Sequence, residues 1–593
     1  MTIIFLVLSV LLATLLRFYG LDAKSLWQDE ITTLKHVTSG GIQDLLSSVL
    51  NKELPAPPLY FLLIHLVSFL GSGDFLLRFP SAIFGILGVT AVYKLGEALF
   101  GRTEGLLAAF LLTLSPLHVR YSQEARAYAL FMLLSIWALF SLWKGMGGRE
   151  RKWWVGFIIS NILNLYTHLF ALLVLLTEGL IFFSLWLRGF VGRRPEARSK
   201  VGKASLRFLG STAITVVCYL PMVSYLWRAI HSGKGLGGVD FTPGMSPTPA
   251  FFAGVFGVFG TGAGAALLIF AACFLSGLIG SFKKQVNQGL LALLWIGVPF
   301  GVLFAFPAKH GFRPRHLIFI LPLYLILVSN GVSTLGRLIS DLTGYAGGIR
   351  RRSLWATWLL FLYLLFAALG LRSLCNYYSE QRADWRLAAR FLARNVAVGE
   401  VVFSRYRLPA IVLPHYTDEL AEVPLVQERP HGVDPATVQR EGGIWFVGAG
   451  RSVLPLAQRV RGSQDDPIFQ LVFGVDPDQA NRAMAESIAP AMLKEIWIAY
   501  FEEGVEAEEL IALYEDALSL ATPHDSVGIE NSLGDLLLQE GRIDEAISHY
   551  QEAISLDPDA PQAHYGLAQV YEEKGWSQLA ADEWEIYTEL TAE

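Results

Sequence analysis

The pattern of hydrophobic positions divides the chain into a long apolar part and a shorter polar part. Up to about residue 375, apolar runs follow one another with only short polar segments between them. A run of roughly 20 apolar residues is what an α-helix needs to cross a bilayer. We therefore predict a mainly α-helical, polytopic membrane domain over residues 1–375, with about eleven spans. These runs are 3–20, 81–99, 104–119, 127–144, 153–167, 169–188, 206–223, 262–282, 288–306, 316–336 and 353–372.

A further apolar segment, 57–71, is short, begins with Pro57 and Pro58, and carries His65. Counting it as a span would place the basic cluster from Lys144 to Lys152 outside the cell, against the preference of Lys and Arg for the cytoplasmic side. We predict a helix that lies in, or dips into, the outer leaflet after an outer loop at 21–56; a short transmembrane helix is the alternative. Eleven spans in the plasma membrane then put the amino terminus in the cytoplasm and the carboxyl-terminal domains outside.

Beyond residue 375 the pattern changes twice. Residues 376–485 contain an amphipathic helix at 385–395 and short apolar strands at 401–404 and 444–447, which predicts a small α/β domain. From about Ala491 the pattern becomes helical, and four residues recur 34 positions later: Leu533, Gly541, Ala546 and Tyr550 return as Leu567, Gly575, Ala580 and Trp584.

This period is the signature of tetratricopeptide repeats, which stack helix pairs into an α-solenoid. We predict a repeat domain over 486–593, with an imperfect unit at 497–520. Its concave surface would recruit an acceptor or a protein partner; a spacer or dimer contact is the alternative.

Composition and charge support this division. A hydrophobic content of 53% exceeds what a soluble chain of 593 residues can bury. Residues 1–375 hold 32 Lys and Arg against 14 Asp and Glu, whereas residues 376–593 hold 15 against 38. The basic part fits loops that face anionic lipid, and the acidic part excludes attraction to nucleic acid. Cys218, Cys273 and Cys375 lie in or beside apolar runs and form neither a disulfide framework nor a cysteine metal site.

Candidate chemistry begins with Asp29-Glu30, an acidic pair directly after the first apolar run. We place it in a loop at the outer membrane surface, where a merely solvated acidic pair is the alternative. Three polar islands between apolar runs share that side: 118–128, 166–168 and 309–316. Charges this close to hydrocarbon are costly and therefore indicate function. The alternative is that the arginines lie at the membrane border and only extend their charged ends into water.

Arginine side chains beside a membrane are suited to a lipid phosphate, because guanidinium binds phosphate oxygens in a forked geometry. A carboxylate opposite them can take a proton from an acceptor hydroxyl. These parts together predict transfer of a sugar from a polyprenyl phosphate. We assign Arg126 and Arg120 to the donor phosphate; a divalent metal, if any, would be held by Asp29 and Glu30. Substrate-binding candidates in the islands are Tyr121, Gln123, Glu124, Tyr128, His168, Arg313 and Arg315.

Four motifs in order strengthen this reading: Leu26–Glu30 (LWQDE), Pro57–Phe61 (PPLYF), Leu77–Ser81 (LRFPS) and Tyr121–Tyr128 (YSQEARAY). They resemble the bacterial branch of the protein-mannosyltransferase and aminoarabinose-transferase superfamily, C-class glycosyltransferases that use lipid-phosphate sugars. The resemblance covers about residues 1–330.

The resemblance implies an inverting transfer in which Asp29 is the general base, with Glu30 beside it, and adds Tyr60 to the substrate-binding residues. The family commonly has His or Lys where Ala56 stands, so Lys52, Arg78 or Arg126 would supply that phosphate contact.

A transporter or lipid flippase with a partner-binding tail is the alternative from another functional class. Transporters carry charges near the bilayer midplane on broken helices. Here the charges collect at the outer ends of the spans, which favours the glycosyltransferase.

Overall fold

The structure is a computed structural model that divides into two compact units. One holds Met1–Ala23 with Thr32–Glu380, and the other holds Lys24–Ile31 with Gln381–Glu593. The structure describes residues 2–591 except 38–39, 51–55, 72, 148–149, 192–194, 225, 228–248, 261–264, 306–312, 343–347, 380–384, 396–400, 405–408, 418–419, 421–424, 428–443, 451–494, 502–506 and 521–522.

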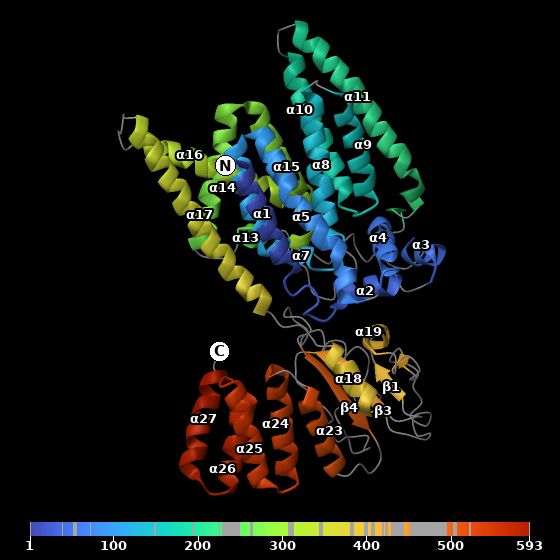
Figure 1. Ribbon diagram of the computed structural model, residues 1–593, viewed down its shortest axis with the longest axis vertical. Helices are drawn as coiled ribbons and strands as arrows, with labels where there is room; N and C mark the ends of the chain where they lie inside the picture. Colours follow the sequence, from blue (N-terminus) through green and yellow to red (C-terminus); the bar gives the residue numbers. More distant parts are fainter. Residues whose placement is uncertain are drawn as a thin grey trace. The chain divides into compact units, whose positions relative to one another are not determined.

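Helices are the regular elements of the described residues of the first unit (Figure 1), and every predicted span except 104–119 overlaps a continuous helical segment. Seven helical segments in the described residues are long and apolar enough to cross a membrane. The predicted count of eleven also includes α1 and α9, which are shorter than 18 residues. The helices are α1 Thr2–Phe18, α2 Gln28–Val37, α3 Ile42–Leu50, α4 Leu59–Ser68, α5 Asp74–Leu99, α6 Arg102–Thr113, α7 Pro116–Ser122, α8 Tyr128–Met146, α9 Arg151–Leu165, α10 Ala171–Val191, α11 Pro195–Tyr219, η1 Leu220–Met222, α13 Pro249–Phe259, α14 Ala265–Lys284, α15 Val286–Ala305, η2 Pro314–Ile320, α16 Leu321–Leu342 and α17 Gly348–Ser379.

The predicted span 104–119 is wrong, because the helix breaks inside it. Helix α6 ends at Thr113, and α7 starts at Pro116 with Ser115 as its N-cap. The Ser115 hydroxyl accepts a hydrogen bond from the His118 amide, 3.5 Å away. Serine at the N-cap followed by proline at the first helical position favours a new helix start, so the apolar run is divided here.

Helix α4 covers the core of the short segment 57–71. Its 10 residues extend about 15 Å, roughly half the thickness of the hydrocarbon core. The alternative of a transmembrane helix is therefore wrong for this segment. The side of the membrane on which α4 lies stays a prediction, as does the orientation of the two termini.

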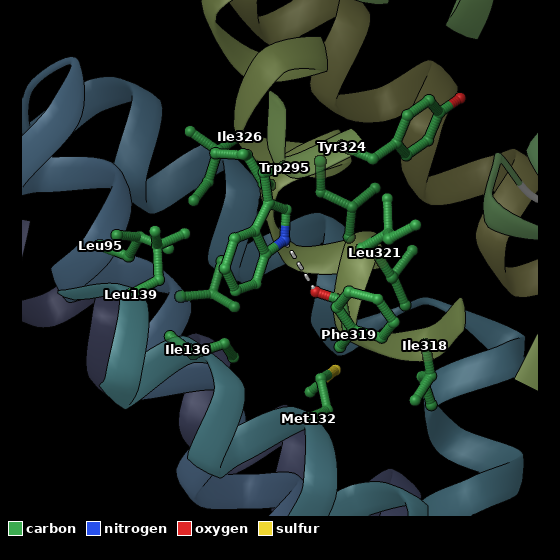
Figure 2. Close-up of a cluster of buried hydrophobic side chains, with 14 of the residues drawn as sticks. Leu95, Met132, Ile136, Leu139, Trp295, Ile318, Phe319, Leu321, Tyr324 and Ile326 are labelled. Carbon is green, nitrogen blue, oxygen red and sulfur yellow. Dashed lines mark hydrogen bonds between the residues drawn. The ribbon is translucent and has the colours of Figure 1, made fainter. Parts of the chain in front are cut away.

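The core of the first unit is built from large side chains of α5, α8, α15, η2 and α16. Figure 2 shows Trp295 at its centre, among Leu95, Ile136, Leu139 and Ile326. The Trp295 indole N–H donates to the Phe319 carbonyl at 3.2 Å, so the one polar atom of this buried ring is paired.

The second unit contains a four-stranded sheet in the order β2-β1-β3-β4, with β1 parallel to β2 and β3, and β4 antiparallel to β3. Its strands are β1 Val401–Ser404, β2 Leu425–Gln427, β3 Ile444–Gly450 and β4 Glu495–Phe501, with helices α18 Trp385–Asn395 and α19 Pro409–Tyr416. The predicted helix at 385–395 and the strand at 401–404 are confirmed.

Strand β4 lies past residue 485, the predicted end of this domain. The prediction of helix from Ala491 onward is wrong at Glu495–Phe501, where a continuous apolar run rich in isoleucine and aromatic residues favours a strand. Five helices follow: α23 Ala507–Leu520, α24 Pro523–Gln539, α25 Ile543–Leu556, α26 Pro561–Glu573 and α27 Ser577–Thr591.

The repeat residues occupy matching positions in these helices. Tyr550 on α25 is fully buried, and a Cβ atom on Gly566 of α26 would lie 2.3 Å from its ring. Glycine at this position lets the two repeats stack closely. Gly541 and Gly575 have φ of 75° and 72°, and each leads from one helix of its repeat to the next.

We predict that Gly331→Ala destabilises the first unit, because α14 and α16 touch through glycines. A Cβ on Gly331 would lie 1.7 Å from the Cys273 carbonyl oxygen, so the helices must separate. Overpacking of this kind costs about 1–3 kcal/mol. Thermal unfolding in detergent should show a lower midpoint for this variant. Gly297→Ala on α15 meets nothing within 4 Å and is the matched control; equal midpoints for both variants would contradict the close packing.

Candidate active site

The acidic pair lies in the first turn of helix α2, not in a loop as predicted. Asp29 and Glu30 are the second and third residues of this 10-residue helix. The backbone N–H groups at a helix start carry partial positive charge, which stabilises carboxylates there. Asp29 is partly exposed, whereas Glu30 is buried.

Glu30 has a local structural task. One of its carboxylate oxygens accepts a hydrogen bond from the Trp27 amide at 3.3 Å. This is the reach-back contact of a capping box, and it fixes the start of α2. In the same unit the Tyr416 hydroxyl accepts a hydrogen bond from the Leu26 amide at 2.9 Å. These two contacts hold the backbone just before Asp29 and occupy the Glu30 carboxylate, so of the pair Asp29 is the better candidate for chemistry.

Metal binding by the pair stays a prediction. In the part of the chain that the structure describes, no group of three or more His, Cys, Asp and Glu residues could hold a metal ion.

Gln123, in the first polar island, is occupied by protein groups. Its side-chain amide nitrogen lies 3.2 Å from the Leu16 carbonyl, 3.3 Å from that of Arg17 and 2.8 Å from that of Tyr19. Its amide oxygen accepts a hydrogen bond from the Tyr377 hydroxyl at 2.9 Å. The side chain satisfies backbone carbonyls at the end of α1, and a substrate-binding role for Gln123 stays a prediction.

Two more predicted residues also have structural partners. Arg78 on α5 is buried and donates to the Leu21 carbonyl at 2.9 Å, so at least one of its donors holds the segment after α1. The Tyr60 hydroxyl lies 2.7 Å from the Ser81 hydroxyl. Ser81 in turn donates to the Arg126 carbonyl at 3.1 Å. This chain of contacts positions the backbone of Arg126.

Aromatic rings and cations gather where the islands meet in the first unit. The rings of Tyr121 and Tyr128 are 4.8 Å apart, and the Arg315 guanidinium lies 5.8 Å from the Tyr128 ring centre. His168 packs 5.6 Å from the Tyr128 ring and stacks on Phe131 at 4.5 Å. The structure thus brings together candidates from all three islands.

His168 is neutral at physiological pH. Burial, and then the positive charges of Arg126 and Arg315, lowers the pKa of His168 to about 3. Its Nδ1 accepts a hydrogen bond from the Phe170 amide at 3.2 Å, which places the remaining ring proton on Nε2. The ring therefore offers a hydrogen-bond donor beside two arginines, and it adds no third positive charge.

The remaining candidates have definite surroundings. Arg120 lies over the Tyr377 ring at 5.2 Å, which is a cation–π distance. Glu124 is buried, and Arg126 is partly exposed. Arg313 is the N-cap of η2, where its amide donates to His316 Nδ1 at 3.4 Å. Lys52 lies outside the described residues.

The sequence did not single out three residues that hold backbone near the candidates, each within its own unit: Ser81 and Arg17 in the first unit and Tyr416 in the second. Arg17 is fully buried and donates to the Ala13, Thr113 and Leu112 carbonyls at 3.2, 3.3 and 3.2 Å. It also lies 2.7 Å from His118 Nδ1. A lone arginine at the end of an apolar run was a signal for such a role. Tyr416 carries no comparable signal in the sequence.

We predict that Gln123→Met lowers the thermal midpoint, because methionine keeps the shape but cannot donate to the α1 carbonyls. Leaving buried polar groups unsatisfied costs about 1–3 kcal/mol each. Gln578→Met on α27 loses an exposed contact to Asp582 and should change stability by less than about 0.5 kcal/mol. Unchanged stability of Gln123→Met together with weaker substrate binding would favour the substrate role.

Comparison with known proteins bears on both parts of the chain. Residues 55–225 match the family model described as dolichyl-phosphate-mannose-protein mannosyltransferase. Residues 534–575 match the model of a TPR repeat. No curated protein sequence matches the chain. The resemblance drawn from the four motifs, and the repeats drawn from the 34-residue period, are confirmed.

Solved structures with a similar chain path include ArnT from Cupriavidus metallidurans in the apo state, at 15% identity and TM-score 0.47, covering 74% of this chain and 92% of that one. ArnT bound to undecaprenyl phosphate has 14% identity and TM-score 0.48, with 84% and 99% covered. The oligosaccharyltransferase AglB from Archaeoglobus fulgidus, in complex with an inhibitory peptide and a dolichol-phosphate, has 12% identity and TM-score 0.49, with 72% and 64% covered.

Residues 55–225 are therefore similar to the protein-mannosyltransferase family of glycosyltransferases. They lie in the helical membrane part of the chain, and residues 534–575 near the carboxyl end match a tetratricopeptide repeat.

Proposed function

We propose that the protein transfers a sugar from a polyprenyl-phosphate donor to an acceptor hydroxyl on a protein, lipid or glycan at the outer face of the plasma membrane. The match of residues 55–225 to a family named for dolichyl-phosphate-mannose is the observation that carries this proposal. It favours the transferase over a transporter. A tetratricopeptide tail gives the enzyme a surface for a protein acceptor or partner.

Asp29 is the general base of this reaction. Its carboxylate takes the proton of the acceptor hydroxyl while the acceptor oxygen attacks the anomeric carbon. The bond from that carbon to the phosphate oxygen breaks, and the lipid phosphate leaves with the electron pair. Attack opposite the leaving group inverts the anomeric configuration. The position of Asp29 in the first turn of a helix, directly after a backbone segment held at Leu26 and Trp27, supports this role.

The leaving phosphate needs positive charge, because negative charge develops on it as the bond breaks. Arg126 and Arg315 both lower the pKa of His168, so both positive charges lie near this ring in the first unit. Because the His168 ring is neutral, the positive charge near it is that of the arginines and is available to the phosphate. The ring adds an Nε2–H group that can donate a hydrogen bond. We assign the phosphate to Arg126 with support from Arg315 and Arg120.

We predict that Asp29→Asn abolishes transfer in a folded protein, because the amide keeps shape and polarity but cannot accept the proton. Loss of a general base lowers the rate about 10²–10⁴-fold. Mass spectrometry of surface glycans and glycoproteins in cells that carry wild type or the variant gives the readout. Asp44→Asn, on the neighbouring helix α3, is the matched control and should retain activity. Full activity of Asp29→Asn would remove Asp29 from the mechanism.

We predict that Arg126→Lys keeps part of the activity with weaker donor binding, whereas Arg126→Ala loses turnover at unchanged thermal stability. Lysine retains the charge but not the forked geometry. Arg102→Ala, which removes an exposed ion pair with Glu97, should behave as wild type. If Arg126→Ala instead unfolds at lower temperature and Glu124→Gln restores it, the partner of Arg126 is Glu124 and not phosphate.

A further inference from the structure

The last helix of the repeat domain exposes apolar side chains where the preceding repeat exposes charges. Trp576, Leu579 and Ile586 are 45%, 46% and 37% exposed. The residues 34 positions earlier are Arg542, Glu545 and Glu552. Arg542 forms ion pairs with Glu508 at 3.0 Å and Glu545 at 2.6 Å, as expected of a solvated face.

Leu579 and Ile586 lie on one side of α27, because residues seven apart in a helix return to the same face. In Figure 1, α27 stands at the end of the row of helices α23–α27. Exposed apolar side chains on one side of a helix are candidates for an interaction site. We name Trp576, Leu579 and Ile586 the α27 patch.

The charge around the patch selects the partner. Helix α27 contains Asp582, Glu583, Glu585 and Glu589 and no Lys or Arg. Lys574 lies 5.3 Å from the Trp576 ring centre, and its charge is paired with Asp544. An anionic lipid surface and a second copy of the same helix would both be repelled. A helix with an apolar stripe bordered by basic residues would bury the patch and pair with these carboxylates.

Within this unit a basic amphipathic helix already packs against an acidic repeat helix. Helix α18 is basic and amphipathic: Arg386, Arg390 and Arg394 alternate with the buried Trp385 and Leu392. It packs against α23, which, like α27, carries four acidic residues and no basic one. Arg394 lies 3.4 Å from the Ser519 hydroxyl of α23. An acidic repeat helix of this chain therefore accepts a basic amphipathic helix.

We propose that the α27 patch binds an arginine- or lysine-bearing amphipathic helix of a partner protein. The contact is a helix-in-groove mode in which apolar anchors supply affinity and charge supplies selectivity. This inference does not depend on the proposed transfer reaction, and its test reads binding alone.

The probe is a fluorescein-labelled peptide of residues 384–396 of this chain, titrated with the full-length protein in detergent and followed by fluorescence polarisation. Leu579→Glu combined with Ile586→Glu should weaken binding at least tenfold. These substitutions install the residues that α25 carries at the equivalent positions, so the thermal midpoint should not change. Gln578→Glu with Thr588→Glu adds the same charge at other exposed positions of α27 and should retain binding.

Three results would overturn the proposal. Equal binding by the Leu579→Glu, Ile586→Glu protein would place the peptide elsewhere. Equal binding of a peptide with its three arginines replaced by glutamate would show that the acidic residues of α27 do not select a basic helix. Sedimentation that shows a wild-type dimer, dissociated by the double substitution, would make the occupant a second copy. Retained peptide binding that falls as salt rises supports the proposal.

Discussion

Backbone carbonyl groups at helix ends inside the apolar part are the constraint on which the first unit depends. In hydrocarbon each such group must be paired within the protein, because no water is present to bond it. Arg17 pairs carbonyls of Leu112 and Thr113 at the end of α6, and Gln123 pairs those of Leu16, Arg17 and Tyr19 at the end of α1. The chain can therefore stop α6 early and turn into the polar α7 segment.

That early turn is what allows cations to gather beside the membrane. The segment after α7 places Arg126, whose carbonyl is held by Ser81 and through it by Tyr60. The Tyr128 ring packs on His168 and lies within cation–π distance of Arg315. Charges in such surroundings are costly to maintain, so their presence favours a charged ligand over a purely structural role. A lipid phosphate meets this requirement.

The sequence predicted the helices, the repeats and the family well, because apolar run length and a 34-residue period are local properties. The sequence-based predictions are wrong where contacts between distant residues determine the local structure. The apolar run continues through Leu114 and Ser115, so hydropathy predicts one uninterrupted span there. The Ser-Pro sequence that begins a new helix is nevertheless present. The sequence does not reveal that Gln123 bonds the α1 carbonyls, because these lie about a hundred residues earlier in the chain. Strand β4 is not predicted, because the strand with which it pairs, β3, is separated from it by a long segment of the chain. The sequence predicts a loop at Asp29-Glu30, because two adjacent charged residues after an apolar run do not look like the start of helix α2.

The central claim is tested most directly by the choice of donor. Full-length protein reconstituted in lipid is offered one radiolabelled sugar carried on polyprenyl phosphate, on polyprenyl diphosphate or on a nucleotide, together with a membrane extract of acceptors. The account predicts that label leaves the lipid only from polyprenyl phosphate, with release of one lipid phosphate for each sugar transferred. Transfer from the nucleotide sugar, or movement of the intact donor across the bilayer without transfer, would contradict it.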